Sequence, residues 1–442
     1  MDSITSRLRL FGTFWDSRFE DFTKETWLKT TYRDFSAGLI VALTAIPMAM
    51  GFSMAMGLRP EQGIIAGALA CIVGRTFGGS KYQVYGPTAA FIPVVAGLMT
   101  KYSQDGANFA NAHGFLVLCS IVAGVILMLM GLFGLGRFAK LVPNSIVVGF
   151  TVGIAVAIAL TNLGEALGLA LDGKGTLFKR LGDIAGHIGD TNPYAVVLAA
   201  TTFLMSRYLL RISVFIPAPL IALATCTVLT ATVWADKGIM VVGDKYGKIP
   251  SNFFVFTAPH LPDISAMLLV DMTYFVSAIV FVSAVESLLC SSMADRLAGN
   301  KGTPFNADKE FWGQGLVQII TPLVNGFPCT GALARTATSI KAGAVTPLAG
   351  YFKGFLKLGM ATFLAPYLEM VPMACIGGIL LWVAGNMIKP SEIKEVMEEK
   401  RVHVGLMIYT AITVPIFGFL EGVLSALILY ALLYKFRRAS VA

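Results

Sequence analysis

Two breaks in the apolar pattern of this chain have the composition of an anion site built from helix ends. The first is Gly86-Pro87, which is followed by Thr88-Ala89-Ala90-Phe91. Glycine lets the backbone approach a ligand closely, and proline suits the first positions of a helix. The free N–H groups of such a helix start carry about half a positive charge and favour an anion. The alternative interpretation is an ordinary helix start between two loops.

The second break, Thr330-Gly331, follows the same pattern. The small residue Ala332 comes next, and a helical run begins with Leu333-Ala334-Arg335. Two such helix starts that face each other would attract an anion, and Arg335 would add a fixed positive charge. An arginine inside a bilayer needs a partner in either case, so the alternative role of Arg335 is to pair with a carboxylate.

The third candidate is Glu286, the lone acidic residue of a long apolar run. An intramembrane carboxylate is a functional hypothesis by default. Glu286 could carry a proton, because burial disfavours the charged form, or it could bind sodium with the hydroxyls of Ser287 and Ser291. The structural alternative is a salt bridge to Arg335, which does not exclude a coupling role.

No motif of enzymatic or nucleotide chemistry accompanies these residues. The sequence has no phosphate loop, no dinucleotide-binding glycine pattern and no nucleophile elbow. Its six cysteines and four histidines are scattered, so we expect neither a disulfide framework nor a zinc site. We therefore expect no enzyme and no resident cofactor. A membrane enzyme with Glu286 as acid and Arg335 as electrophile is a remote rival.

The chain that must position these residues belongs in a lipid bilayer. Of its 442 residues, 56% are hydrophobic and only 14% are charged, against about 25% charged residues in an average soluble domain. This composition excludes disorder and argues against a soluble enzyme or a nucleic-acid-binding protein. The net charge of +8 then reflects the orientation of the chain in the membrane, because basic residues collect in cytoplasmic loops.

Fourteen apolar segments indicate an all-α polytopic membrane protein. The third and tenth, 88–99 and 332–342, are shorter than the roughly 20 residues that span a bilayer. If the fourteen segments form two halves of seven, each short element is the third of its half. Short, Gly/Pro-interrupted elements at such matching positions indicate a transporter with inverted repeats. The alternative is that both elements are merely short re-entrant loops. The segments are 35–55, 61–78, 88–99, 114–135, 142–162, 193–210, 214–234, 268–293, 311–326, 332–342, 346–368, 370–388, 402–418 and 420–435.

The polar stretches predict the orientation and the boundaries. Lys and Arg concentrate on one side when the N-terminus is placed in the cytoplasm, so we expect both termini there. Residues 1–33 form an amphipathic N-terminal segment, either on the membrane surface or as a soluble collar. The transmembrane domain follows over 34–435, with 436–442 as a short cytoplasmic tail. The mixed-charge stretch 295–310 is expected to be a cytoplasmic loop with helix caps.

Several motifs in register resemble the SulP family of anion transporters, which includes sulfate permeases and carriers of bicarbonate and dicarboxylates. The resemblance covers about residues 34–435. It rests on Asp34-Phe35-Ser36-Ala37-Gly38-Leu39 with Ala45-Ile46-Pro47, on Gly86-Pro87-Thr88-Ala89-Ala90-Phe91, on Glu286-Ser287-Leu288-Leu289-Cys290, on Gly313-Gln314-Gly315, on Gly331-Ala332-Leu333-Ala334-Arg335-Thr336-Ala337, and on Gly343-Ala344-Val345-Thr346-Pro347-Leu348.

The resemblance implies a core domain and a gate domain. Core segments, about 34–135 and 268–368, would carry the anion between the third and tenth helix N-termini. Gate segments, about 136–234 and 370–435, would scaffold the core and form the contact of a homodimer. Transport would be an elevator-like movement of the core against the gate.

The resemblance also implies the site residues. The substrate would contact Met48, Thr88, Ala89, Ala90, Phe91, Leu333, Ala334 and Arg335, and the coupling ion would bind at Glu286, Ser287 and Ser291. Two positions depart from the common pattern: Met48 replaces a glutamine, as in the bicarbonate-carrying branch, and Ala334 replaces a serine. The usual C-terminal STAS domain does not follow, so the chain is either a natural short form or a trimmed one.

These observations lead us to expect secondary active transport of a small anion across the plasma membrane, the inner membrane in a bacterium. Sulfate and bicarbonate are the leading candidates. The coupling ion would be a proton or sodium. The bicarbonate-carrying branch of the family that the chain resembles is sodium-coupled and has an acidic residue at the position of Glu286. The alternatives are a C4-dicarboxylate carrier and an uncoupled exchanger or channel on the same scaffold.

Overall fold

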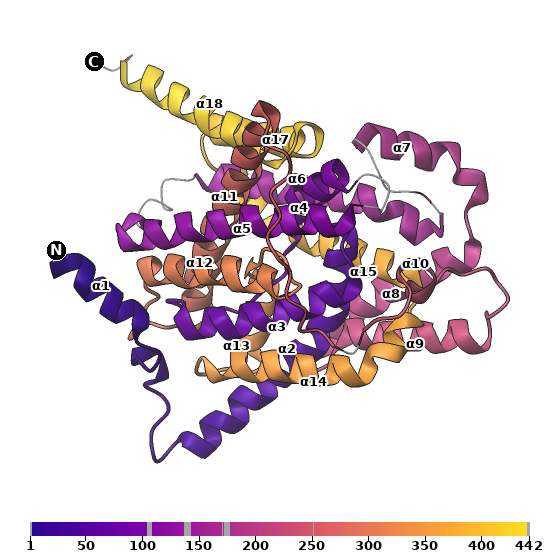
Figure 1. The fold of residues 1–442 in the computed structure, drawn as a ribbon, viewed down its shortest axis with the longest axis horizontal. Coiled ribbons are helices and arrows are strands. Elements are labelled where there is room, and N and C mark those ends of the chain that lie inside the picture. The colour runs from indigo at the N-terminus through magenta and orange to yellow at the C-terminus, as the bar shows by residue number, and fades with distance from the viewer. Residues whose placement is uncertain are drawn as a thin grey trace.

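A computed structural model describes residues 2–103, 108–136, 143–169, 171, 177–250 and 252–439. The first half of the chain contains α1 (Asp2–Gly12), η1 (Ser17–Phe19), α2 (Trp27–Ala55), α3 (Pro60–Phe77), β1 (Tyr85–Gly86), η2 (Ala89–Phe91), α4 (Ile92–Tyr102), α5 (Phe109–Leu132), α6 (Asn144–Leu167), α7 (Leu177–Gly186), η4 (Ile188–Asp190), α8 (Pro193–Ile212), α9 (Ala218–Thr232) and α10 (Val242–Tyr246). The second half contains α11 (Ala266–Ala298), α12 (Ala307–Leu323), β2 (Thr330–Gly331), α13 (Leu333–Lys341), α14 (Leu348–Glu369), α15 (Met373–Met387), α16 (Pro390–Met397), α17 (Arg401–Phe417) and α18 (Phe419–Ala439) (Figure 1).

Each of the fourteen predicted apolar segments coincides with a helix, which confirms their secondary structure. Six helical stretches in the described part of the chain are long and apolar enough to cross a membrane: Trp27–Ala55, Phe109–Leu132, Asn144–Leu167, Pro193–Ile212, Ala266–Ala298 and Met373–Met397. One boundary differs from the expectation. The helix α2 begins at Trp27, so residues 27–33 belong to the first long helix rather than to the N-terminal segment.

Local chemistry sets several helix ends. The hydroxyl of Ser265 accepts from the N–H of Leu268 at the start of α11, and Asn306 caps α12 in the same way. The helices α6 and α11 end at Gly168 and Gly299, whose φ angles are 71° and 64°. Glycine reaches this left-handed conformation without the steric cost that other residues incur.

One group of helices packs around α3. The helices α2, α3 and α14 contact one another, α12 lies against α3 and α5, and α11 contacts α5, α12 and α13. The contact between α2 and α3 is close at Gly63, where a side chain would collide with the carbonyl of Ala49. Small residues therefore let these two helices approach each other.

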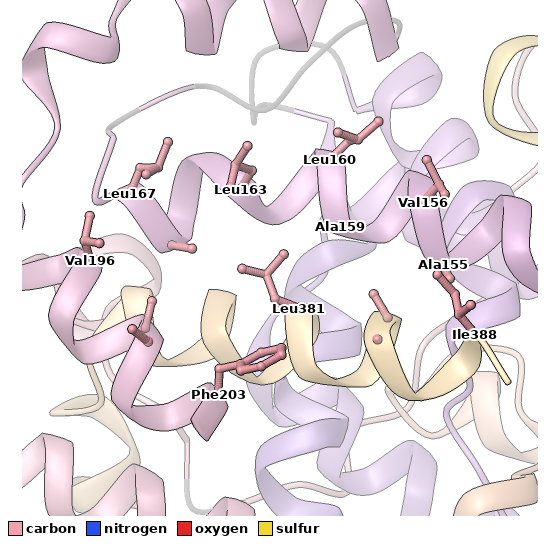
Figure 2. Close-up of a pocket in the computed structure, with 15 residues that line it drawn as sticks. Ala155, Val156, Ala159, Leu160, Leu163, Leu167, Val196, Phe203, Leu381 and Ile388 are labelled. Carbon is pink, nitrogen blue, oxygen red and sulfur yellow. The ribbon is translucent and has the colours of Figure 1, made fainter. Parts of the chain in front are cut away.

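A second group is formed by the remaining long helices. The helix α6 contacts α15 and α17, α8 contacts α15 and α9, and α17 contacts α18. Between α6, α8 and α15 lies a cavity of about 530 Å³ with an entirely apolar lining that includes Leu163, Phe203 and Leu381 (Figure 2). The two groups meet where α2 contacts α9 and α15 and where α11 contacts α18.

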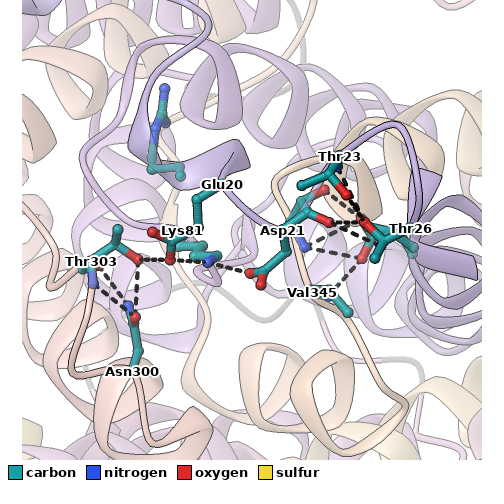
Figure 3. Close-up of polar contacts among 12 residues, drawn as sticks. Glu20, Asp21, Thr23, Thr26, Lys81, Asn300, Thr303 and Val345 are labelled. Carbon is teal, nitrogen blue, oxygen red and sulfur yellow. Dashed lines mark hydrogen bonds and ion pairs between the residues drawn. The ribbon is translucent and has the colours of Figure 1, made fainter.

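The N-terminal segment is docked onto the first group by charged side chains. The amine of Lys81 bonds Glu20 at 2.9 Å and Asp21 at 2.6 Å, and the hydroxyl of Thr303 donates to Glu20 at 3.0 Å (Figure 3). Phe11 is buried and stacks on Trp312 of α12. Other apolar residues of the segment, among them Phe14 and Trp15, remain exposed.

Two further contacts complete the docking. The guanidinium of Arg18 donates to the carbonyls of Arg75 and Gly78, and the amine of Lys309 bonds Asp16 at 2.6 Å. Burial opposes ionisation of Asp16, but the hydrogen bonds from Arg18 and Lys309 outweigh it and lower the pKa of this carboxyl. The N-terminal segment is thus held by ion pairs to the end of the first helix group.

Candidate functional site

The two predicted breaks meet in space. The strands β1 and β2 pair antiparallel, with Tyr85 opposite Gly331 and Gly86 opposite Thr330. The helical turns of η2 and α4 follow β1, and α13 follows β2. Because these strands pair, and because Arg335 at the start of α13 reaches Pro87 directly after β1, the segments that lead into both helix starts meet at one crossing.

Hydrogen bonds from the facing segment hold the first break in place. The N–H of Val84 donates to the hydroxyl of Thr336 at 2.9 Å, and the N–H of Ala332 donates to the carbonyl of Val84 at 2.9 Å. The second break is held by α12, where the amide of Gln318 donates to the carbonyl of Cys329 at 2.8 Å. The first break is therefore positioned by residues far away in the sequence, and the second is also held by the helix that precedes it.

Neither helix start at the crossing is closed by a side chain. The residues before them, Thr88, Phe91 and Ala332, make no capping hydrogen bond through their side chains. The first N–H groups of a helix have no acceptor within the helix and need one from outside. Two uncapped helix starts at one point form a concentrated positive potential.

Arg335 connects the two breaks. Its side chain comes from the first turn of α13, is 4% exposed, and donates through Nη2 to the carbonyl of Pro87. The absence of a side chain at Gly86 makes room for this guanidinium, because a Cβ there would lie 3.0 Å from Nη1. Nη1 itself has no hydrogen-bond partner among the described residues.

Glu286 lies at the same point. Its carboxylate lies beside the side chain of Thr88, and Arg335 is near enough for the two charges to interact. The two residues do not form a direct ion pair within 4.0 Å in the described chain, so the predicted structural alternative of a Glu286–Arg335 salt bridge is not what the structure shows. Three buried polar atoms here lack a partner in the described protein: Thr88 Oγ1, Glu286 Oε2 and Arg335 Nη1.

The two serines predicted to assist Glu286 are directed elsewhere. The hydroxyl of Ser287 donates to Glu310 at 2.6 Å, and that of Ser291 donates to the side-chain oxygen of Gln83 at 2.6 Å. Both serines are completely buried. They support the segment before the first break, through Gln83 and Glu310, rather than extending the Glu286 site.

Glu310 was wrongly expected to lie in a cytoplasmic loop. The expected loop over 295–310 covers only 299–306, and Glu310 lies in the first turn of α12 with an exposed fraction of 0%. Its carboxylate accepts from the hydroxyl of Tyr85 at 2.7 Å and from the N–H groups of Gly79 and Ser80. A charged stretch in sequence is usually solvated, and only these long-range donors make burial of the carboxylate favourable.

The other predicted substrate residues divide into two kinds. Met48, Ala89, Ala90 and Phe91 are buried in one hydrophobic cluster, so they form the packed wall around the first helix start. Leu333 is partly buried and Ala334 is exposed. The start of α13 is therefore uncovered on one side.

Two buried lysines near the crossing were not identified from the sequence. Lys353 and Lys357 lie on α14 with exposed fractions of 1% and 0%. Lys353 donates to the carbonyl of Tyr85 at 2.7 Å, directly before the first break. Two lysines four residues apart inside an apolar run were the signal that could have revealed them.

The apolar cavity of the second helix group is a separate feature. Its lining has no charged residue and no polar side chain to recognise an anion. A small anion needs hydrogen-bond donors or positive charge, and in the described chain these converge at the crossing of the two breaks. The crossing is therefore the candidate site.

A candidate anion site made of helix ends inside a bundle of apolar helices is typical of a membrane transporter for anions. The chain belongs to the Sulfate permease family, whose sequence pattern matches residues 32–410. It is a multi-pass membrane protein of that family.

The relatives support this assignment. The chain is 34% identical over 426 residues to the putative sulfate transporter YvdB of Bacillus subtilis, a match that covers 96% of this chain and 77% of the relative. It is 26% identical over 370 residues to the bicarbonate transporter BicA of Picosynechococcus, covering 83% of this chain and 63% of that protein.

Solved structures show the same fold. The transmembrane domain of a cyanobacterial bicarbonate transporter BicA superimposes with a TM-score of 0.77 at 23% identity, covering 90% of this chain and 98% of that one. The structure of SLC26A9 superimposes with a TM-score of 0.81 at 18% identity, covering 99% of this chain and 70% of that one. The predicted all-α transporter fold is thereby confirmed.

Proposed function

We propose that this protein carries a small oxyanion, sulfate or bicarbonate, across the membrane by secondary active transport. The observation that carries the proposal is the group of three unpartnered polar atoms, on Thr88, Glu286 and Arg335, at the meeting point of two uncapped helix starts. Buried polar groups are normally paired. An anion held by the first-turn N–H groups, Thr88 and Arg335 would satisfy the donors.

The relatives support the choice of substrate. YvdB is named a putative sulfate transporter and BicA a bicarbonate transporter. Both anions present oxygen acceptors to N–H donors, so the same helix ends suit both. The chain contains no phosphate-binding loop, and we infer that an ion gradient or the substrate gradient drives transport.

We infer that Glu286 carries the coupling ion. Its Oε2 is free to take up a proton, and Arg335 is near enough for protonation to alter the electrostatics of the anion site. A sodium ion would need several oxygen ligands, and the hydroxyls of Ser287 and Ser291 already donate to Glu310 and Gln83. This arrangement favours a proton over sodium.

We infer further that the first helix group is the mobile core and that the second is the gate. Both breaks, Glu286 and Arg335 belong to the first group, so the whole site can move as one body against α6, α8, α9, α15, α17 and α18. In this proposal transport is elevator-like, and the gate forms the contact of a homodimer. Both termini lie on the cytoplasmic side of the plasma membrane.

The test uses the purified full chain in sealed vesicles. Uptake of sulfate, bicarbonate, chloride and a C4-dicarboxylate is measured with and without sodium and with and without an inward proton gradient. Concentrative uptake of an oxyanion that follows the proton gradient and ignores sodium supports the proposal. Uptake that requires sodium and ignores pH would overturn proton coupling. Flux without accumulation would indicate an uncoupled exchanger or channel, and no flux of any anion would reject the function.

The coupling residue has its own variant. Glu286→Gln keeps the size of the side chain and cannot release or take up a proton. We expect anion exchange to persist and concentrative uptake to fall to the background level. Unchanged accumulation in this variant would mean that another group couples the ion. Glu395→Gln, at an exposed position of α16, is the matched control.

A further inference from the structure

The buried lysines of α14 have no role in the mechanism described above. Lys353 and Lys357 are four residues apart, so both project from one face of the helix. Both are buried to at least 99% in a helix that packs between α2 and α3. A lysine is almost never fully buried unless it is paired, so their surroundings need an explanation.

Their amines contact uncharged groups: backbone carbonyls and, for Lys353, the side chain of Cys71. Lys353 Nζ donates to the carbonyls of Gly67 at 3.0 Å and Tyr85 at 2.7 Å. Lys357 Nζ donates to the carbonyl of Gly63 at 3.2 Å. Among the residues that the structure describes, no acidic side chain forms an ion pair with either lysine.

Two other buried carboxylates of the described chain are already occupied. Glu310 accepts from Tyr85, Ser287 and backbone N–H groups, and Asp34 accepts from the N–H groups of Val345 and Thr346. The other two buried lysines of the described chain, Lys81 and Lys309, do have carboxylate partners. Lys81 is paired with Glu20 and Asp21, and Lys309 is paired with Asp16.

Both lysines lie beside the first break. Tyr85, whose carbonyl binds Lys353, is the first residue of β1. A side chain added at Gly67 would touch both the amine of Lys357 and the ring of Pro87, which places the two side by side. The charge of Arg335 acts on both lysines. Three basic side chains therefore surround the segment that starts the proposed anion-binding helix.

The charges of this cluster do not balance within the protein. When both amines are protonated, Arg335, Lys353 and Lys357 contribute three positive charges, and Glu286 contributes one negative charge when ionised, which leaves an excess of two. Burial without a carboxylate partner disfavours the protonated amines when no anion is bound, and a bound anion favours them. Uncompensated charge is costly in a low-dielectric interior. A ligand with two negative charges would remove the excess.

We propose that Lys353 and Lys357 determine the charge of the anion that the site accepts, and that they make it prefer a doubly charged anion over a singly charged one. This inference rests on the proposed transport function. The lysines act at a distance through their charge, whereas Thr88, Arg335 and the helix N–H groups contact the anion directly. The rival role is a purely structural one, in which the amines only tie the carbonyls of Gly63, Gly67 and Tyr85 together.

Glutamine substitutions separate the two roles, because glutamine retains a hydrogen-bond donor and loses the charge. The variants Lys353→Gln and Lys357→Gln of the full chain are reconstituted in vesicles, and KM is measured for sulfate as the doubly charged probe and for bicarbonate and chloride as singly charged ones. Lys81→Gln is the control, because that buried lysine has carboxylate partners in the protein. Gel filtration in detergent checks that each variant is folded.

We expect the wild-type protein to prefer sulfate, and each lysine variant to raise the KM for sulfate about tenfold, corresponding to about 1.4 kcal/mol. The KM for bicarbonate and chloride should change less than about threefold, and the control should keep the wild-type ratio. Equal losses for all three anions, or an unchanged ratio, would show that the lysines only tie the backbone.

Two outcomes distinguish a failure of this inference from a failure of the proposed transport function. If the wild-type protein transports no anion, the proposed function fails. If it transports anions without preferring sulfate, the lysine proposal is wrong while transport stands. The wild-type measurement decides this point even if a lysine variant does not fold.

Discussion

Arg335 in the first turn of α13 donates a hydrogen bond to the carbonyl of Pro87, which lies 248 residues away in the first break. One side chain thus bridges the two helix starts and still keeps Nη1 free of protein partners. A planar guanidinium can serve two acceptors at once through separate N–H groups. We infer that Nη2 maintains the crossing and that Nη1 is available for the anion.

Replacement of Arg335 by lysine should therefore abolish most transport, although the charge is retained. An ammonium lacks the fork that reaches both Pro87 and a ligand. We expect anion uptake into vesicles to fall at least about tenfold, which corresponds to about 1.4 kcal/mol. Arg211→Lys at an exposed position of α8 should behave like the wild type. Full activity of Arg335→Lys would contradict the bridging role.

Removal of the Thr88 hydroxyl should weaken anion binding without affecting the fold. Thr88→Val keeps the shape, and the Thr88 hydroxyl makes no hydrogen bond of normal geometry to the protein, although Glu286 lies beside it. A hydrogen bond contributes about 0.5–1.5 kcal/mol, so we expect KM to rise about threefold to tenfold. The control is Thr410→Val, because that hydroxyl bonds the carbonyl of Leu406 within its own helix. Equal KM values in Thr88→Val and the wild type would exclude this hydroxyl from the site.

Glu310→Ala should destabilise the protein strongly. The substitution leaves the hydroxyls of Tyr85 and Ser287 and the N–H groups of Gly79 and Ser80 without their acceptor. Each buried unsatisfied group costs about 1–3 kcal/mol, so we expect a loss of about 3 kcal/mol or more. The midpoint of thermal unfolding in detergent, followed by gel filtration, measures it. A midpoint equal to that of Glu395→Ala, at an exposed position of α16, would refute the network.

The docking of the N-terminal segment should depend on pH through Asp16. Because hydrogen bonds from Arg18 and Lys309 lower the pKa of Asp16 in the folded protein despite its burial, its contribution to docking is complete above the ordinary pKa of 3.8. The contribution is lost as the pH falls through the lowered value. The protection of the amides of residues 13–20 against hydrogen exchange, taken relative to the intrinsic exchange rate at each pH, should therefore be high at pH 7 and fall below about pH 4.

A substitution tests at neutral pH whether the Asp16 carboxylate holds the N-terminal segment. Asp16→Asn removes the charge, and trypsin should then cleave after Arg18 faster than in the wild type, because the released segment exposes that residue. Asp236→Asn, on an exposed loop, is the control. Identical cleavage rates in Asp16→Asn and the wild type would show that the segment is held without this carboxylate.

Much of the fold could be predicted from the sequence, because the relevant signals are local. An apolar run of sufficient length forms a membrane helix wherever it occurs. The Gly86-Pro87 and Thr330-Gly331 breaks were recognisable for the same reason, since glycine and proline act on their own backbone. Glu286 and Arg335 were recognisable as site candidates because charged groups are rare in such runs, and Thr88 because it follows the Gly86-Pro87 break.

The tertiary structure decided which polar groups face one another. Sequence position did not reveal that Ser287 turns to Glu310, that Glu310 is buried beneath Tyr85, or that Lys353 binds the carbonyl of Tyr85 from 268 residues away. Hydrogen bonds are short-ranged and directional, so their partners depend on how distant helices pack. The sequence by itself determined the helices and the two breaks; the packing determined the charges and donors that surround them.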